Sequence, residues 1–262
     1  MKEKWALVLG ASGGFGMAAC RYLSSQSFNL ILVLRERKFV FKKVEKEFEA
    51  LRENGSQLII FNKNINDVSN IEEITVQLVT EYRLVNKISF VLHAIADGNL
   101  KSFFSDDYND AIKIDDLNHT TFSMGHSFAT ITQALFYKGL LQKGASIVGL
   151  TSEGVDKYFD SYAAIASSKA VLESHMRYMA VELAKYKIRV NLIKAGITDT
   201  NALKSFPNYE EFIEKAKERN PSGRLTKPED INGVIGLLAS DISEHITGTI
   251  FTIDGGEHLI SI

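Results

Sequence analysis

Two side chains that can handle protons, Tyr162 and Lys169, stand seven positions apart in this chain. Apolar residues recur at helical spacing after them: Leu172, Met176, Met179 and Leu183. This spacing places Lys169 near the start of an amphipathic helix. If the helix extends back to Tyr162, seven residues make about two turns and return both side chains to one face. An ammonium group lowers the pKa of a neighbouring phenol, which makes the phenol a usable proton donor. We therefore predict that Tyr162 and Lys169 are catalytic, although a single Tyr or Lys more often serves packing or the surface.

Two further hydroxyl groups precede this pair. Ser152 follows an apolar run and lies seventeen residues before Lys169. It is a candidate for hydrogen bonding to a substrate, and the alternative is a hydroxyl that closes a turn after the strand. Tyr158, four residues before Tyr162, is a candidate substrate contact and a rival proton donor.

A glycine-rich segment near the N-terminus has the form of a phosphate-binding turn. The apolar run Trp5–Leu9 leads into it, and a helical run follows it. Glycines permit a tight turn and close approach to a pyrophosphate, while the helix start presents unpaired N–H groups to the anion. The alternative is a glycine-rich turn without a ligand. The predicted cofactor contacts are Gly10, Ser12, Gly13, Gly14, Phe15 and Gly16.

Charged residues after the second apolar run bear on which dinucleotide binds. An acid at this position binds an unmodified adenosine ribose, and a base binds its 2′-phosphate. Arg35 is the first base after the run, so we predict NADP(H), with NAD(H) possible because Glu36 could bind a ribose hydroxyl. Asn64 and Ile65, after the third run, are candidate adenine contacts, with an ordinary polar turn as the alternative.

The elements that position these residues alternate between strand and helix. Predicted strands lie at Trp5–Leu9, Leu30–Leu34, Leu58–Phe61, Ile88–His93, Ser146–Leu150, Val190–Ile193 and Thr249–Ile253. Helical spacing occurs at Phe39–Asn54, Ile71–Tyr82, Phe122–Leu141, Ala166–Lys185 and Pro228–Ala239. This alternation predicts an α/β fold, a Rossmann-type doubly wound parallel sheet of about seven strands in a single domain over residues 1–262. Ligands of such sheets bind at the carboxyl ends of the strands. All three prolines (Pro207, Pro221 and Pro228) lie in one region after the sixth strand, and its segment 198–227 is the predicted substrate lid.

Composition excludes several other classes of function. The formal net charge of -2 offers no basic field for nucleic acid or an anionic membrane. No apolar run is long enough to span a bilayer, and no Cys/His cluster has the spacing of a metal site. The single cysteine, Cys20, cannot form an internal disulfide. We expect a cytoplasmic protein with no metal, nucleic-acid partner or membrane association.

Several motifs in order resemble the short-chain dehydrogenase/reductase superfamily over essentially the whole chain. The segments Gly10–Gly16 and Ile253–Gly256 match its cofactor turn and C-terminal signature. Most members carry Tyr-x-x-x-Lys, but that tyrosine position is Ile165 here. The arrangement Tyr-x6-Lys is similar to that of enoyl-acyl-carrier-protein reductases. The run from Tyr162 to Pro207 looks most like their divergent NADPH-using bacterial branch.

This resemblance implies further site residues. The loop after the fourth strand would place His93 and Ala94 at the cofactor and Ala96 at the substrate. Residues of the loop after the sixth strand would hold the nicotinamide carboxamide: Gly196, Ile197, Thr198 and Thr200. Lys169 would also bind the nicotinamide ribose.

The implied reaction is reduction of the trans-2 double bond of an enoyl thioester in fatty-acid synthesis. Hydride goes to Cβ, and charge develops on a thioester oxygen three bonds away, so the donor must lie further out than in a ketoreductase. Tyr162 would stabilise the enolate there. The resemblance also implies an acyl carrier protein as a transient partner and a homotetramer joined through the helices predicted at Phe122–Leu141 and Ala166–Lys185.

Two alternatives remain open at this point. Ser152 and the weak likeness between Val91 and Leu141 favour another superfamily oxidoreductase acting on a ketone or a 3-ketoacyl thioester. Ile165 and Met124, which stand where most members carry a catalytic tyrosine and asparagine, favour a non-catalytic NADP(H)-binding regulator.

Overall fold

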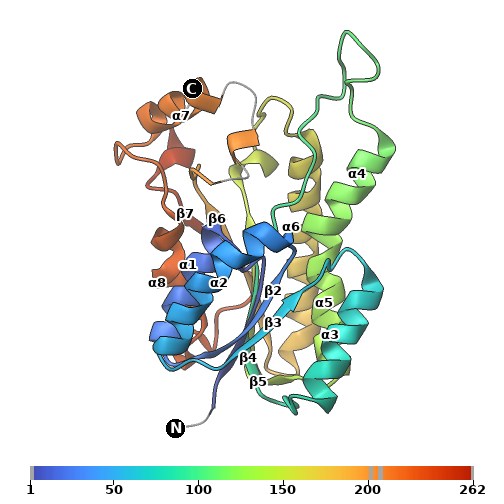
Figure 1. Ribbon diagram of the computed structural model, residues 1–262. Helices are drawn as coiled ribbons and strands as arrows, with labels where there is room; N and C mark the ends of the chain where they lie inside the picture. Colours follow the sequence, from blue (N-terminus) through green and yellow to red (C-terminus); the bar gives the residue numbers. More distant parts are fainter. Residues whose placement is uncertain (1–2, 201–202, 206–208, 261–262) are drawn as a thin grey trace.

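Seven parallel strands form one sheet in the order β3-β2-β1-β4-β5-β6-β7 in the computed structural model, which describes residues 3–200, 203–205 and 209–260 (Figure 1). The strands are β1 (Trp5–Leu9), β2 (Asn29–Leu34), β3 (Leu58–Asn62), β4 (Ile88–His93), β5 (Leu141–Thr151), β6 (Arg189–Ala195) and β7 (Ile250–Ile253). All seven predicted strands are confirmed. The strand β5 begins five residues earlier than predicted, and the bounds of the other strands differ by at most two residues.

Helices cover both faces of the sheet. They are α1 (Gly14–Ser25), α2 (Lys38–Glu53), α3 (Val68–Thr80), α4 (Ile114–Thr121), α5 (Ser127–Tyr137), α6 (Ala163–Ala184), α7 (Tyr209–Arg219) and α8 (Asn232–Leu238). A π-helical turn (Phe122–His126) joins α4 to α5, and short 3-10 turns occur at Glu153–Val155, Leu203–Ser205, Pro228–Ile231, Asp241–Ser243 and Glu257–Leu259.

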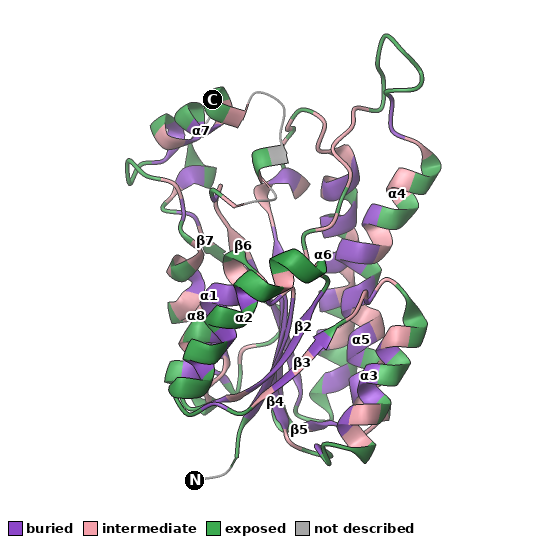
Figure 2. Cartoon of the chain, in the orientation of Figure 1, coloured by how far each residue is buried: buried purple, intermediate pink, exposed green. Residues whose placement is uncertain are grey.

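The core has two layers, one on each face of the sheet. The helices α1, α2 and α8 pack on one face, and α3, α5 and α6 pack on the other. The central strands β1 and β4 are buried along their whole length, because helices cover both of their faces (Figure 2). This burial explains why their sequences are continuous apolar runs.

The order of the strands places a crevice in the middle of the sheet. From β1 the chain proceeds outward to β2 and β3, then crosses back to β4 on the other side of β1. Connections on either side of β1 and β4 therefore leave in opposite directions, which opens a space at their carboxyl ends. The doubly wound sheet predicted from the sequence is confirmed, and it forms a single domain.

The helix predicted at Phe122–Leu141 is shorter than expected. It begins with the π-helical turn, and α5 ends at Tyr137. Gly139 then adopts a φ of 67°, a left-handed conformation that ends helices, and Leu141 begins β5. The helix predicted at Ala166 begins instead at Ala163, so Tyr162 occupies its N-cap position. None of the helices in the described ranges is long and apolar enough to cross a membrane.

Candidate active site

A cavity of about 720 Å³ opens at the carboxyl ends of the central strands. Its volume falls within the range of small-molecule sites. Most of the predicted site residues line it: Gly10, Ser12, Gly13, Gly14, Phe15, Arg35, Asn64, Ile65, Ala94, Ala96, Ser152, Tyr162, Lys169, Gly196, Ile197, Thr198 and Thr200. Segments far apart in the chain therefore meet at one cavity, as the predicted topology requires.

The glycine-rich turn has the geometry of an anion site. Gly10 has a φ of 84°, and a Cβ there would lie 2.5 Å from the carbonyl oxygen of Ala94. Gly13 caps α1 without a side-chain hydrogen bond, and the first turn of α1 contains no acidic residue. The first amides of an α-helix have no partner within the helix, and Gly14 and Phe15, in the first turn of α1, line the cavity. This cradle fits the pyrophosphate of a dinucleotide.

Gly16 and His93, two predicted cofactor contacts, do not line the cavity. A Cβ on Gly16 would overlap the carbonyl oxygen of Gly10, so this glycine allows α1 to pack against the turn. His93 is fully buried beneath the site, where its Nε2 lies 2.7 Å from the hydroxyl of Ser127. Burial, with a smaller contribution from the charge of Lys169, lowers the pKa of His93 to about 3. His93 is therefore a neutral, buried side chain that packs beneath the site and contacts Ser127.

The Tyr162 hydroxyl donates a hydrogen bond to the Ser152 hydroxyl at 3.2 Å, and both residues line the cavity. Gly154 lets the ring approach the strand end, because a Cβ on Gly154 would overlap that ring. We expected a lowered pKa for this phenol. Burial instead raises the pKa of Tyr162, and the hydrogen bond with Ser152 offsets this only in part. Tyr162 is therefore neutral at physiological pH and able to donate its proton.

Lys169 is buried and lines the same cavity as Tyr162. Its Nζ donates a hydrogen bond to the carbonyl oxygen of Leu150 at 2.8 Å. Burial lowers the pKa of Lys169 to about 8, because leaving water disfavours the ammonium form. At pH 7 the charged form still predominates, so the cavity contains a cation close to the end of β5.

Tyr158 does not reach the cavity, which corrects our expectation of a substrate contact. Its side chain is 86% exposed, and its hydroxyl lies 3.4 Å from the carboxylate of Asp160. The chain between the 3-10 turn at Glu153–Val155 and α6 directs this ring outward. Of the two candidate tyrosines, only Tyr162 lines the site.

An aspartate that we did not predict organises the other end of the cavity. The carboxylate of Asp97 lies 3.0 Å from the Arg35 guanidinium and 3.3 Å from both Asn66 Nδ2 and His119 Nε2. Asp97 therefore links the ends of β2, β3 and β4 to α4. Its place four residues after His93, in a loop already assigned to the cofactor, was the signal that could have revealed it.

Asn64 and Ile65 lie at the cavity as predicted, but Asn64 also builds the turn after β3. Its side-chain oxygen accepts a hydrogen bond from the amide of Asn66, and its backbone carbonyl accepts one from Asn70 Nδ2. The turn and the candidate adenine contact are therefore compatible at this position.

The cavity wall is apolar where most members of the superfamily carry their tyrosine. Ile165 lines the cavity beside Met124, and both side chains approach Gly98 so closely that a Cβ there would meet them at 2.9 and 3.0 Å. The Ile165 side chain offers no proton donor at this position, whereas the Tyr162 hydroxyl belongs to a side chain that lines the same cavity.

Helix α7 contributes an aromatic side chain to the cavity that sequence reasoning missed. Phe212 packs edge to face on Phe159 at 6.2 Å between ring centroids, and Phe159 packs on Tyr162 at 6.0 Å. This helix lies within the predicted lid, residues 198–227. Within that lid, residues 201–202 and 206–208, including Ala202 and Pro207, are outside the described residues. Over the part of the chain that is described, no group of three or more potential metal ligands occurs.

Comparison with known proteins agrees with this site. Residues 10–258 match the family model described as "Enoyl-(Acyl carrier protein) reductase". The chain is 29% identical to the enoyl-acyl-carrier-protein reductase (NADH) FabI of Bacillus subtilis over 196 residues, which is 74% of this chain and 73% of the relative. It is 26% identical to the corresponding Enterococcus faecalis protein, with 99% of each chain covered.

A solved structure shows the same fold. The Bacillus cereus enoyl-acyl-carrier-protein reductase, in complex with NADP+ and an indole naphthyridinone, superposes with a TM-score of 0.87 at 22% identity, covering 100% of this chain and 98% of that one. Fold, motif order and the family match over nearly the whole chain agree. The protein is therefore an oxidoreductase that belongs to the enoyl-acyl-carrier-protein reductase family of the short-chain dehydrogenases.

Proposed function

We propose that the protein reduces the trans-2 double bond of an enoyl-acyl-carrier-protein thioester with NADPH, as a step of fatty-acid synthesis. The observation that carries this proposal is the position of the Tyr162 hydroxyl. It lies in the cavity, while the residue at the tyrosine position of most superfamily members, Ile165, presents only an apolar side chain. A donor at Tyr162 suits an oxygen that lies away from the carbon that receives hydride.

A bound reduced nicotinamide would supply the hydride that attacks Cβ of the substrate. Negative charge then develops on the thioester oxygen, and the neutral Tyr162 hydroxyl stabilises it by a hydrogen bond. Because burial raises the pKa of Tyr162, this phenol keeps its proton until the enolate forms. Protonation at Cα completes the reduction.

Lys169 acts on the same charge from inside the protein. Its ammonium group is buried, so water screens it weakly and its field at the developing enolate is strong. Its hydrogen bond to Leu150 holds the group at the end of β5, from which it would contact the ribose of the cofactor.

The cradle at α1 would hold the pyrophosphate, and Arg35 would bind the 2′-phosphate of NADPH. Arg35 and Lys63 both line the adenosine end of the cavity, where they pair with Asp97 and Glu73. Both side chains would have to exchange part of these ion pairs for contacts with the 2′-phosphate. The Bacillus subtilis and Enterococcus faecalis relatives are named as NADH enzymes, and this preference would distinguish the protein from them, whereas the Bacillus cereus structure contains NADP+. Glu36 also lines the cavity and would accept a ribose hydroxyl when NADH binds.

We extend the proposal to the setting of the enzyme. The segment 198–227 would cover the acyl chain, with Phe212 as its apolar contact. An acyl carrier protein would deliver the substrate in the cytoplasm, where the buried Cys20 remains a free thiol. A homotetramer would form through α5 and α6, which expose the large side chains Tyr137, Tyr178 and Val181.

Turnover of matched substrates by Tyr162→Phe tests the reaction. We expect the wild type to oxidise NADPH with an enoyl thioester and the variant to lose on the order of a hundredfold in kcat, because one hydroxyl carries the enolate charge. Tyr158→Phe is the matched control and should retain full activity, since this ring is exposed away from the cavity. The matching 3-ketoacyl thioester is assayed in parallel. Faster turnover of the ketone would favour a ketoreductase, for which the Tyr162–Ser152 hydrogen bond is a suitable donor pair.

The cofactor preference has its own test. Arg35→Ala should raise the KM for NADPH about tenfold and leave the KM for NADH nearly unchanged, because only the former carries the 2′-phosphate. Arg37→Ala, an exposed neighbour that does not line the cavity, is the control. A wild type that uses NADH more efficiently than NADPH would overturn the preference while leaving the reaction class intact.

A further inference from the structure

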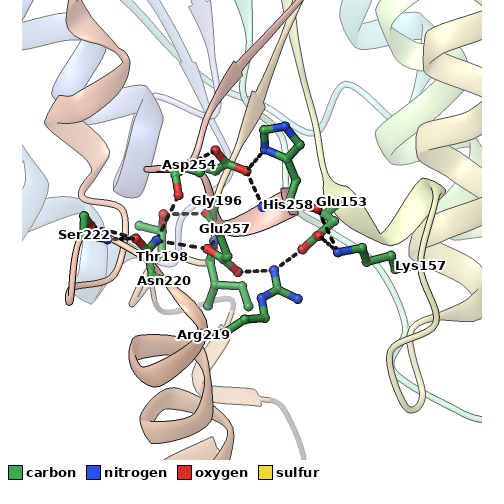
Figure 3. A network of polar contacts seen from close by, with 12 residues as sticks. Glu153, Lys157, Gly196, Thr198, Arg219, Asn220, Ser222, Asp254, Glu257 and His258 are labelled. Carbon is green, nitrogen blue, oxygen red and sulfur yellow. Dashed lines mark hydrogen bonds and ion pairs between the residues drawn. The ribbon is translucent and has the colours of Figure 1, made fainter. Parts of the chain in front are cut away.

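A buried arginine joins three parts of the chain behind the catalytic end of the cavity. Arg219, the last residue of α7, is 5% exposed. One of its guanidinium nitrogens, Nη2, contacts the carboxylates of both Glu257 and Glu153 (Figure 3). Glu257 follows β7 and is 1% exposed, and Glu153 follows β5. A single cation thus bridges two strand ends and a helix of the predicted lid.

The Glu257 arm of this bridge reaches the loop after β6. While Oε1 of Glu257 contacts Arg219 at 2.5 Å, Oε2 accepts a hydrogen bond from the backbone amide of Ile197 at 3.3 Å and one from Asn220 Nδ2 at 3.4 Å. Ile197 lines the cavity at the end that the nicotinamide would occupy. Movement of Glu257 would therefore move the backbone of that loop.

The Glu153 arm reaches the proton donor. Glu153 is the neighbour of Ser152, whose hydroxyl contacts that of Tyr162, and it begins the 3-10 turn whose Gly154 lies against the Tyr162 ring. The other carboxylate oxygen of Glu153, Oε1, forms an ion pair with Nζ of Lys157 at 2.6 Å. The position of Glu153 therefore affects both the partner and the packing of Tyr162.

The bridge also fixes the far end of α7. Phe212 lines the cavity near the start of this helix, and Arg219 anchors its last turn. An anchor at one end limits how far the other can swing away from Phe159 and Tyr162.

Burial of these charges is costly, since each ion loses its hydration and the attraction between them only offsets that loss. An apolar cluster would stabilise the same three elements at least as well. A buried arginine between two carboxylates instead imposes a specific geometry, because removing Arg219 leaves the buried Glu257 carboxylate without its counter-charge.

Building on the proposed function, we propose that Arg219 is a positioning residue. Through Glu257 it holds the Ile197 loop against the cofactor. Through Glu153 it holds Ser152 and Tyr162 in the positions from which the phenol can donate a hydrogen bond to the enolate oxygen. The two arms have separable effects. Loss of the Glu257 arm weakens cofactor binding, and loss of the Glu153 arm lowers the rate of the chemical step.

The test compares Arg219→Met, Glu257→Gln and Glu153→Gln with wild type in two assays. One is the dissociation constant of NADPH, followed by its fluorescence, and the other is kcat and KM with an enoyl thioester. We expect Arg219→Met to lose on the order of tenfold in both cofactor affinity and kcat, because small displacements of reacting groups have large effects on rate. Glu257→Gln should lose mainly cofactor affinity. Glu153→Gln should lose mainly kcat.

Two further variants separate positioning from stability. Arg219→Lys should recover most of both parameters, because one nitrogen makes both contacts and an ammonium can replace it. Arg224→Met breaks the exposed ion pair with Asp230 in the same segment and should leave both parameters unchanged. If Arg219→Met fails to fold, the two Gln variants decide the matter.

Unchanged cofactor affinity and kcat in all three variants, with only a lowered melting temperature, would overturn the proposal. Absence of enoyl turnover in wild type would overturn the proposed function instead. The cofactor affinity of Glu257→Gln would still decide whether the Arg219 bridge holds the Ile197 loop.

Discussion

At the scale of single residues, burial determines which ionisable groups can take part in chemistry. His93, Tyr162 and Lys169 all lie at or beneath the cavity, and in each case loss of water is the largest influence on the pKa. Each shift favours the neutral form. Tyr162 is thereby kept as a proton donor, His93 is kept uncharged, and Lys169 titrates near pH 8.

The depressed pKa of His93 predicts a loss of stability in mild acid. In the unfolded chain His93 takes up a proton as the pH falls below 6.5, its ordinary pKa, whereas in the folded chain it stays neutral down to about pH 3. The free energy of unfolding therefore falls as the pH falls from 6.5 to 3. From pH 6.5 to 5 this one group removes about 2 kcal/mol. Urea unfolding of wild type and His93→Gln at the two pH values should show a drop that is smaller in the variant by about that amount.

His245→Gln, at an exposed position, is the matched control for this experiment. An equal loss of stability in wild type and His93→Gln would mean that the ring is not kept neutral by burial.

At the scale of elements, the turn between β1 and α1 combines two demands on the backbone. Gly10 needs a left-handed φ of 84°, and it also needs the absence of a Cβ, because the Ala94 carbonyl after β4 lies directly against it. The turn thus serves both the anion cradle and the contact between two strand ends.

Substitution of Gly10 and of Gly55 by alanine distinguishes the cost of the left-handed backbone from the cost of a clash with the Ala94 carbonyl. Gly55 has a similar φ of 92°, but a Cβ there meets no atom within 4 Å. Gly55→Ala should therefore cost only backbone strain, about 1–2 kcal/mol. Gly10→Ala should cost about 3 kcal/mol or more and weaken dinucleotide binding, because the Ala94 carbonyl must also move.

Chemical denaturation and NADPH titration of both variants check the expectation for Gly10. Equal destabilisation by the two substitutions would show that the close approach of Ala94 contributes little.

At the scale of the whole molecule, the helices α5 and α6 pack on the sheet with one side and expose large apolar side chains on the other. Val181 is 78% exposed and Tyr178 is 69% exposed, both on α6. If the proposed homotetramer forms there, Val181→Lys should shift the protein to a smaller species, because a lysine buried between subunits loses its hydration. Light scattering coupled to size-exclusion chromatography measures the change.

Val68→Lys, at an exposed position on α3, is the control for added charge. A wild type that already elutes as a monomer, or a Val181→Lys variant with the mass of wild type, would rule out assembly through this face.

Much of the fold and of the site could be predicted from the sequence alone, because the relevant signals are local. Buried parallel strands are apolar runs, and the glycine turn lies between one such run and a helix within about a dozen residues. The pair Tyr162 and Lys169 is likewise separated by two turns of one helix. Such features depend on residues that are close together in the sequence, so local periodicity is enough to predict them.

Tertiary structure alone decided which side chains face the cavity and how distant charges pair. Tyr158 faces outward although it stands only four residues before Tyr162, and His93 lies beneath the site rather than in it. The ion pair of Arg35 with Asp97 and the bridge from Arg219 to Glu153 and Glu257 join residues 38 to 66 positions apart. Such contacts depend on where the crossovers return each strand end, and no local pattern in the sequence carries that information.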